Sequence, residues 1–205
     1  MQGIVFEYEQ LRSTRNRQFT IRLSERKQVG DKWVKQGPTT VYFTSNLQEI
    51  TNKVVDYFLF QKALESEMEF RKLEGRFASH EEEYTILRIS PHDLREFIDE
   101  TKRNKALCDK DGNILKFNYI SDVKPEIIFQ HGNDGYSIGI YLQGIEYSKL
   151  DYTLLSKQVI AVYKDRILAL HPDIPQNFFK SLPLDRKIPF KELENMHHLI
   201  YTSTK

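Results

Sequence analysis

The chain has 205 residues, of which 40% are hydrophobic, and its 30 Lys and Arg against 29 Asp and Glu give a formal net charge of +1. This balance excludes a strong overall attraction to nucleic acid, to an anionic membrane or to an acidic substrate, so a local patch must bind any charged partner. The single cysteine, Cys108, excludes a disulfide scaffold, and no apolar run approaches the ~18 residues of a membrane helix, so we expect a cytoplasmic protein without a membrane partner.

Near the start of the chain the pattern predicts two strands joined by a long loop. Phe19, Ile21 and Leu23 alternate with polar residues, as in a half-buried strand. Residues 39–44 form a second β-branched and aromatic run, which also favours a strand. Gly30 and the glycine and proline at 37–38 lie between the two runs, so we expect a long hairpin loop there.

Two later segments have the pattern of amphipathic helices. Residues 46–64 follow a Ser or Asn cap and have apolar side chains with helical spacing at 47, 50, 54 and 58. After an apolar, strand-like run at 84–89, Ser90 can cap a helix and Pro91 suits its first turn. This second helix should end near Lys105 and bury Leu94, Phe97, Ile98 and Thr101.

Strand patterns dominate the remainder of the chain. The expected strands are residues 114–119, 127–130, 136–143, 158–163, 166–170 and 187–189, with turns at 131–135 and 164–165, and short helices are expected at 176–181 and 191–200. Hairpins alternate with helices without regular βαβ units, so we predict an α+β fold of antiparallel β-hairpins interspersed with several short helices. Because no Pro/Gly/Ser-rich linker divides the chain, we expect residues 1–205 to form a single module, with any subdivision near residues 105–110.

Most catalytic and metal-binding motifs are missing from the sequence. It contains neither the glycine-rich loop with Lys and Ser/Thr that cradles phosphates nor a Gly-x-Ser-x-Gly turn. Residues 109–113 resemble the start of a calcium loop, but Ile120 stands where the last carboxylate belongs, which favours a glycine-containing β-turn. We therefore expect no catalytic residue, cofactor or metal site in this chain.

A metal-dependent nuclease is the enzymatic alternative. Asp173 and Asp185 would hold Mg²⁺, and Lys187 would lie near the attacking water. The carboxylate-x-Lys spacing occurs four times in the sequence, however, and a chain with 29% charged residues produces it by chance. A third hypothesis is a protein-interaction module without a nucleic-acid role that uses an exposed face such as residues 47–58 or the aromatic strands.

Basic residues gather near the start of the chain and could contact a phosphate backbone from one hairpin. The alternative is a solvated edge, because Lys and Arg also keep exposed edge strands from pairing with other chains. The candidate nucleic-acid-binding residues are Arg12, Arg15, Arg17, Arg22, Arg26, Lys27, Lys32 and Lys35.

The order of these features is similar to that of a known family. The segments that carry the similarity are FTIRLSE, TTVYFTSNLQEITNKVVDYF, LRISPHDLREFIDETKRN, IIFQHGNDGYSIGIYLQG, QVIAVYKDRILAL and PQNFFKSLPLDRKIPFKELENMHHLI. Together they cover most of residues 17–200 and resemble the helicase-associated domain of bacterial Swi/Snf-type DNA-translocating ATPases. The resemblance implies a fragment of a longer chain, a non-catalytic accessory domain that docks on the motor domains of its parent ATPase, contacts double-stranded DNA or recruits a protein partner.

Overall fold

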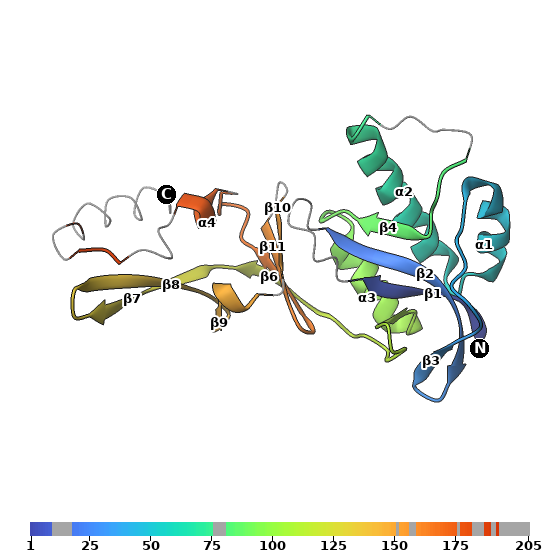
Figure 1. Ribbon diagram of the computed structural model, residues 1–205, viewed down its shortest axis with the longest axis horizontal. Coiled ribbons are helices and arrows are strands. Elements are labelled where there is room, and N and C mark those ends of the chain that lie inside the picture. The colour runs from blue at the N-terminus through green and yellow to red at the C-terminus, as the bar shows by residue number, and fades with distance from the viewer. Residues whose placement is uncertain are drawn as a thin grey trace. The chain divides into compact units, whose positions relative to one another are not determined.

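The computed structural model describes residues 1–9, 18–75, 81–150, 152–155, 159–175, 177–181, 187–189 and 192. These residues form an α+β fold, as the sequence predicts. The chain divides into two compact units, Met1–Phe117 and Asn118–Lys205, so the boundary falls after the 105–110 region where we expected any subdivision (Figure 1). Within the described residues, no helix has both the length and the apolar character needed to span a membrane.

The first unit is built around one sheet. Its strands are β1 (Gln2–Glu9), β2 (Phe19–Val29), β3 (Lys32–Lys35), β4 (Ile86–Ile89) and β5 (Leu107–Cys108). β1 lies between β2, which is antiparallel to it, and β5, which is parallel. β2 pairs on its other edge with β4 near its beginning and with β3 near its end. The first half of β2 therefore contributes buried residues to the core of the unit, and its end forms a hairpin with β3.

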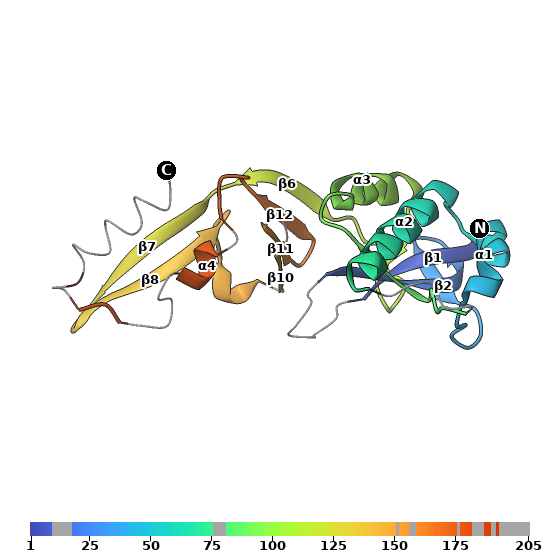
Figure 2. The ribbon, with the colours of Figure 1, turned by 90° about the horizontal axis from the view of Figure 1, so that it is seen from above.

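The helices of the first unit pack against this sheet. They are η1 (Thr44–Asn46), α1 (Leu47–Lys53), α2 (Tyr57–Leu73) and α3 (Leu94–Asn104), and Figure 2 shows α2 and α3 side by side against the strands. The predicted stripe of α3 is confirmed, because Leu94, Phe97, Ile98 and Thr101 are all buried. Phe97 packs edge-on against Phe6 and Phe19 of the sheet, and such aromatic pairs contribute about 0.5–1.5 kcal/mol beyond the area they bury.

The second unit contains two further sheets. Its elements are β6 (Asn118–Val123), β7 (Pro125–Gly132), β8 (Gly135–Leu142), β9 (Ile145–Glu146), η2 (Tyr147–Lys149), β10 (Tyr152–Leu155), β11 (Val159–Tyr163), β12 (Arg166–Leu170) and α4 (Phe178–Ser181). One sheet has the order β7-β8-β9 and the other β10-β11-β12-β6. Their apolar faces share a core that includes Ile140, Leu142, Leu168 and Phe178. The two predicted hairpins are confirmed as β7–β8 and β11–β12.

The first predicted hairpin is wrong in its second strand. β2 continues to Val29, turns at Gly30 and Asp31, and pairs with β3, so the predicted long loop is itself a strand, a turn and a strand. Residues 39–44 form no strand and make only an isolated bridge between Phe43 and Glu83. The strand pattern of residues 25–35 is hard to recognise in the sequence. Exposed lysines alternate there with buried side chains, but one of the buried side chains, Arg26, is itself charged and the other is Trp33.

The predicted helix at 46–64 is two helices. The chain leaves α1 at Val54, whose extended backbone bridges to Ile4 of β1, and the next helix starts after Asp56. The Asp56 carboxylate caps α2 by accepting a hydrogen bond from the Leu59 N–H at 2.9 Å. Phe58 therefore lies at the exposed start of a new helix and does not continue the buried stripe of α1.

Several other boundaries differ from the prediction. Strand 114–119 is displaced to β6, α3 begins at Leu94 instead of Ser90, and residues 187–189 make a single bridge through Ile188 to Tyr136. β1 and β10 were not predicted, and of the predicted helix at 191–200 all but Glu192 lies outside the described residues. The β-turn predicted at 109–113 is confirmed, since the Gly112 N–H donates to the Asp109 carbonyl and Gly112 has a φ of +81° that suits glycine.

Candidate functional site

The sheet of the first unit closes on itself at the end that carries the predicted basic residues. Beyond β5 the chain turns at residues 109–112 and comes back beside β3, where the Trp33 N–H donates to the Gly112 carbonyl at 2.8 Å. Lys32 and Asn113 form an antiparallel bridge at the same place. We call the β2–β3 hairpin (residues 26–35) together with residues 105–114 the closed end.

Arg26 is the buried centre of the closed end. Its side chain donates from Nε to Ser24 Oγ, from Nη1 to the Trp33 carbonyl and from Nη2 to the Lys110 carbonyl, at 3.0–3.1 Å. Nη2 also forms an ion pair with the Glu7 carboxylate at 2.5 Å. Because the guanidinium is buried and bonded on all three nitrogens, we assign Arg26 a structural role in place of the surface contact that the sequence predicted.

Trp33 is also a core residue. Its indole ring is 1% exposed and packs with Val5 and Cys108, while Nε1 donates to the Lys105 carbonyl at 2.8 Å. The closed end thus has a hydrophobic interior. The polar contacts of Arg26 and Trp33 join β1, β2, β3 and residues 105–114, which holds the backbone of these four segments together.

The remaining basic residues lie at the surface. Lys27, Lys32 and Lys35 are exposed, and none of them forms an ion pair with a carboxylate of the described residues. Lys35 Nζ donates instead to Thr39 Oγ1 at 2.8 Å. Arg22 is partly exposed and pairs with Glu9 at 2.9 Å, while positions 12, 15 and 17 of the prediction lie outside the described residues.

The strand register places two of these lysines among apolar side chains. Lys27 is opposite Val34 and Lys32 is opposite Val29, and cross-strand partners share a face of the hairpin. Both valines are exposed, by 57% for Val29 and 46% for Val34. This face therefore presents two cations on a rigid hairpin.

Of the three residues of the nuclease hypothesis, the structure describes Asp173 and Lys187, and each lies beside a different residue. Asp173 is 87% exposed and lies 3.4 Å from His171 Nδ1, while Lys187 pairs with Asp134 at 3.7 Å. Asp185 lies outside the described residues. In the part of the chain that the structure describes, no three His, Cys, Asp or Glu side chains are grouped so that they could hold a metal ion.

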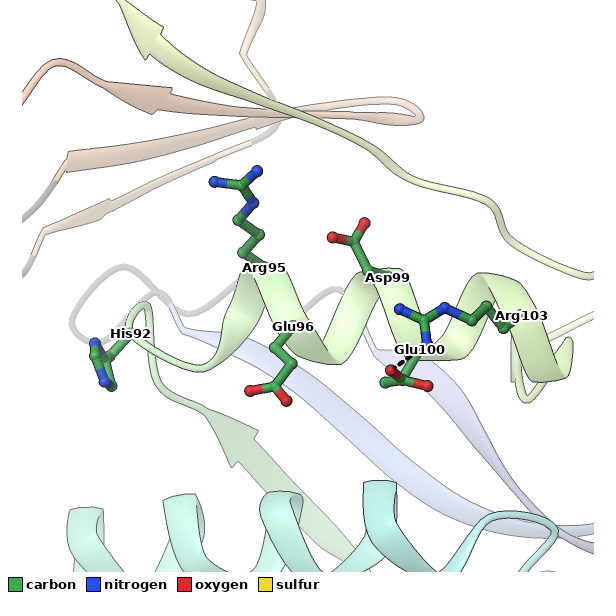
Figure 3. A pocket seen from close by; sticks show the side chains of 6 residues that line it. All are labelled: His92, Arg95, Glu96, Asp99, Glu100 and Arg103. Atoms are coloured by element: carbon green, nitrogen blue, oxygen red, sulfur yellow. Dashed lines mark ion pairs between the residues drawn. The ribbon is translucent and has the colours of Figure 1, made fainter.

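A depression of about 340 Å³ runs along the exposed side of α3. It is lined by His92, Arg95, Glu96, Asp99, Glu100 and Arg103. Figure 3 shows that Arg95 and Asp99 point to one side of the helix and Glu96 to the other, and Arg103 pairs with Glu100 at 2.8 Å. Because these charges diverge or neutralise one another, this helix surface presents no convergent set of groups for a ligand.

Comparison with protein-family models, with curated proteins and with solved structures found no match to this chain. The closed end is the candidate functional site because of the geometry described above. Its basic residues fall into two groups. Arg26 is buried and bonds the segments of the closed end to one another, whereas Lys27, Lys32 and Lys35 are exposed to solvent.

Cys108 lies inside the closed end, and burial raises the pKa of its thiol from the ordinary 9.0 to about 12. Its contribution to the free energy of unfolding is therefore fully present below pH 9.0 and is lost as the pH rises toward 12. Between pH 9.0 and 12 we expect the free energy of unfolding of the wild type to fall more steeply than that of Cys108→Ala. The difference between the two slopes should be up to about 1.4 kcal/mol per pH unit. Denaturant titrations of both proteins between these pH values measure the difference, and parallel curves would contradict it.

Proposed function

We propose that this chain is a non-catalytic accessory module of a Swi/Snf-type DNA-translocating ATPase, and that its β2–β3 hairpin contacts the phosphate backbone of double-stranded DNA. In this proposal the motor domains of the parent ATPase hydrolyse ATP and are the module's second partner. The observation that carries the DNA contact is the exposure of Lys27 and Lys32 on one face of the hairpin, and of Lys35 at its end on the other face, without ion-pair partners among the described carboxylates.

The chemistry of these lysines suits phosphate groups. A lysine ammonium that is not neutralised by a neighbouring carboxylate can replace the counterions condensed on DNA, and the release of those counterions favours binding. The cross-strand partners of Lys27 and Lys32 are the aliphatic side chains of Val34 and Val29, which offer no hydrogen bonds to base edges. The proposed contact therefore positions the module on the duplex without reading its sequence.

The triple variant Lys27→Gln/Lys32→Gln/Lys35→Gln tests this proposal. The dependence of the logarithm of the binding constant on the logarithm of the salt concentration should become shallower by roughly 0.9 for each lysine that contacts a phosphate. This amounts to about 1.8 for Lys27 and Lys32, and to at most about 2.7 with Lys35. Fluorescence anisotropy of a labelled duplex, titrated at several NaCl concentrations, measures this slope for the wild type and the variant.

The matched control is Lys72→Gln/Arg95→Gln/Lys124→Gln, which removes the same charge from three exposed positions that do not belong to the closed end. We expect its slope to stay close to the wild-type value. Equal changes in both variants would show that only net charge matters, and a wild-type chain that does not bind duplex DNA would refute the proposed DNA contact.

A further inference from the structure

We propose that Lys105 and Lys110, which the sequence analysis did not select, belong to the same phosphate-contacting surface as the hairpin lysines. This inference rests on the proposed function and extends its site to a second segment of the chain. The segment is the part of the closed end that follows α3, and it begins 70 positions after the end of the hairpin in the sequence.

Lys105 is held beside the tip of the β2–β3 hairpin. It terminates α3 with a left-handed backbone of φ +51°, and its carbonyl accepts the indole N–H of the buried Trp33. Its ammonium lies 3.7 Å from the carboxylate of Asp31, the residue in the hairpin turn. The half-exposed side chain of Lys105 is thus adjacent to the turn that precedes Lys32.

Lys110 is fixed by the guanidinium at the centre of the closed end. Arg26 Nη2 donates to the Lys110 carbonyl at 3.1 Å, while Nη1 donates to the carbonyl of Trp33 in β3. One buried arginine therefore bonds the backbones of both lysine-bearing segments and sets the distance between them. The Lys110 side chain is exposed and has no carboxylate partner among the described residues.

The two turns also contain carboxylates. Asp109 is engaged within its own turn, where it accepts hydrogen bonds from the backbone N–H groups of Asp111 and Asn113. Asp111 and Asp31, in contrast, are exposed, and Asp31 lies 94% exposed beside Lys105. The negative charge of Asp31 should repel a phosphate group, so we expect that its removal strengthens the binding of duplex DNA.

Two variants test the inference with opposite expected effects. Lys105→Gln/Lys110→Gln should make the salt dependence of duplex binding shallower by roughly 1.8, or about 0.9 for each lysine, whereas the control Lys72→Gln/Lys124→Gln should leave it unchanged. Asp31→Asn should tighten binding at low salt by about two- to fivefold, the range expected for one exposed charge. A gain of affinity cannot come from a variant that fails to fold.

The outcomes separate this inference from the proposed function. If the hairpin triple variant weakens binding but Lys105→Gln/Lys110→Gln and Asp31→Asn both behave as the wild type, the second segment lies outside the surface and the inference is wrong. If the wild-type chain does not bind duplex DNA, the proposed function and the inference both fail. Circular dichroism of each variant checks that its fold is retained.

Discussion

Replacement of Arg26 by Ala is expected to lower the free energy of unfolding by about 3–5 kcal/mol, the range for removal of one partner from a buried ion pair. The reason is that the Glu7 carboxylate and the Trp33 and Lys110 carbonyl groups lose their donor inside the closed end. Chemical denaturation followed by tryptophan fluorescence measures this effect well, because Trp33 is the sole tryptophan and lies beside the substituted residue.

The control for Arg26 is Arg22, four residues earlier on the same strand. Arg22 forms an ion pair with Glu9, but both side chains are 27% exposed, so solvent screens the interaction. Arg22→Ala should therefore cost less than about 1 kcal/mol. Similar losses for the two variants would mean that Arg26 does not have the structural role assigned to it.

Replacement of Glu67 by Ala is expected to have a comparable effect, again about 3–5 kcal/mol. This α2 carboxylate is buried and accepts hydrogen bonds from Arg71 Nε, from Arg88 Nε and Nη2, and from the Arg88 backbone N–H in β4. Its hydrogen bonds also raise the pKa of Arg88. Without Glu67, two partly buried arginines would lose their main partner, and the backbone N–H of Arg88 in β4 would lose its acceptor.

Glu49→Ala serves as the control for Glu67. Glu49 pairs with Lys53 on the exposed side of α1 with the same i,i+4 spacing that Glu67 has to Arg71, so its loss should change stability little. Glu67→Gln keeps an acceptor for the β4 N–H and should lie between the wild type and Glu67→Ala. Thermal unfolding monitored by circular dichroism ranks the variants, and a Glu49→Ala loss as large as that of Glu67→Ala would contradict this account.

Much of the fold could be predicted from local patterns. The stripe of α3 and the β7–β8 and β11–β12 hairpins depend on periodicity and turn residues within short segments, and these predictions are confirmed. The break between α1 and α2 depends on a distant partner, because Val54 leaves the helix to bridge to Ile4. β1 contains three consecutive buried apolar residues, Ile4, Val5 and Phe6, so the alternation that marks a half-buried strand is missing.

The candidate site could be predicted only in part, because it too depends on contacts between residues that are distant in the sequence. Composition drew attention to the basic cluster, but it could not separate the buried Arg26 from the exposed Lys27 next to it in the sequence. That separation depends on the Glu7 carboxylate in β1 and on the Lys110 carbonyl, which is 84 positions away. Lys105 and Lys110 gave no sequence signal, because contacts between residues more than 70 positions apart bring their segment to the hairpin, among them the Arg26–Lys110 and Trp33–Lys105 hydrogen bonds.

Lysine footprinting tests the central claim most directly. The chain is acetylated with an amine-reactive reagent in the presence and absence of a duplex, and the modification of each lysine is quantified by mass spectrometry. The proposed surface predicts that DNA protects Lys27, Lys32, Lys35, Lys105 and Lys110 and leaves the exposed Lys72 and Lys124 as reactive as before. Protection of Lys72 or Lys124 without protection of the closed end would contradict the account.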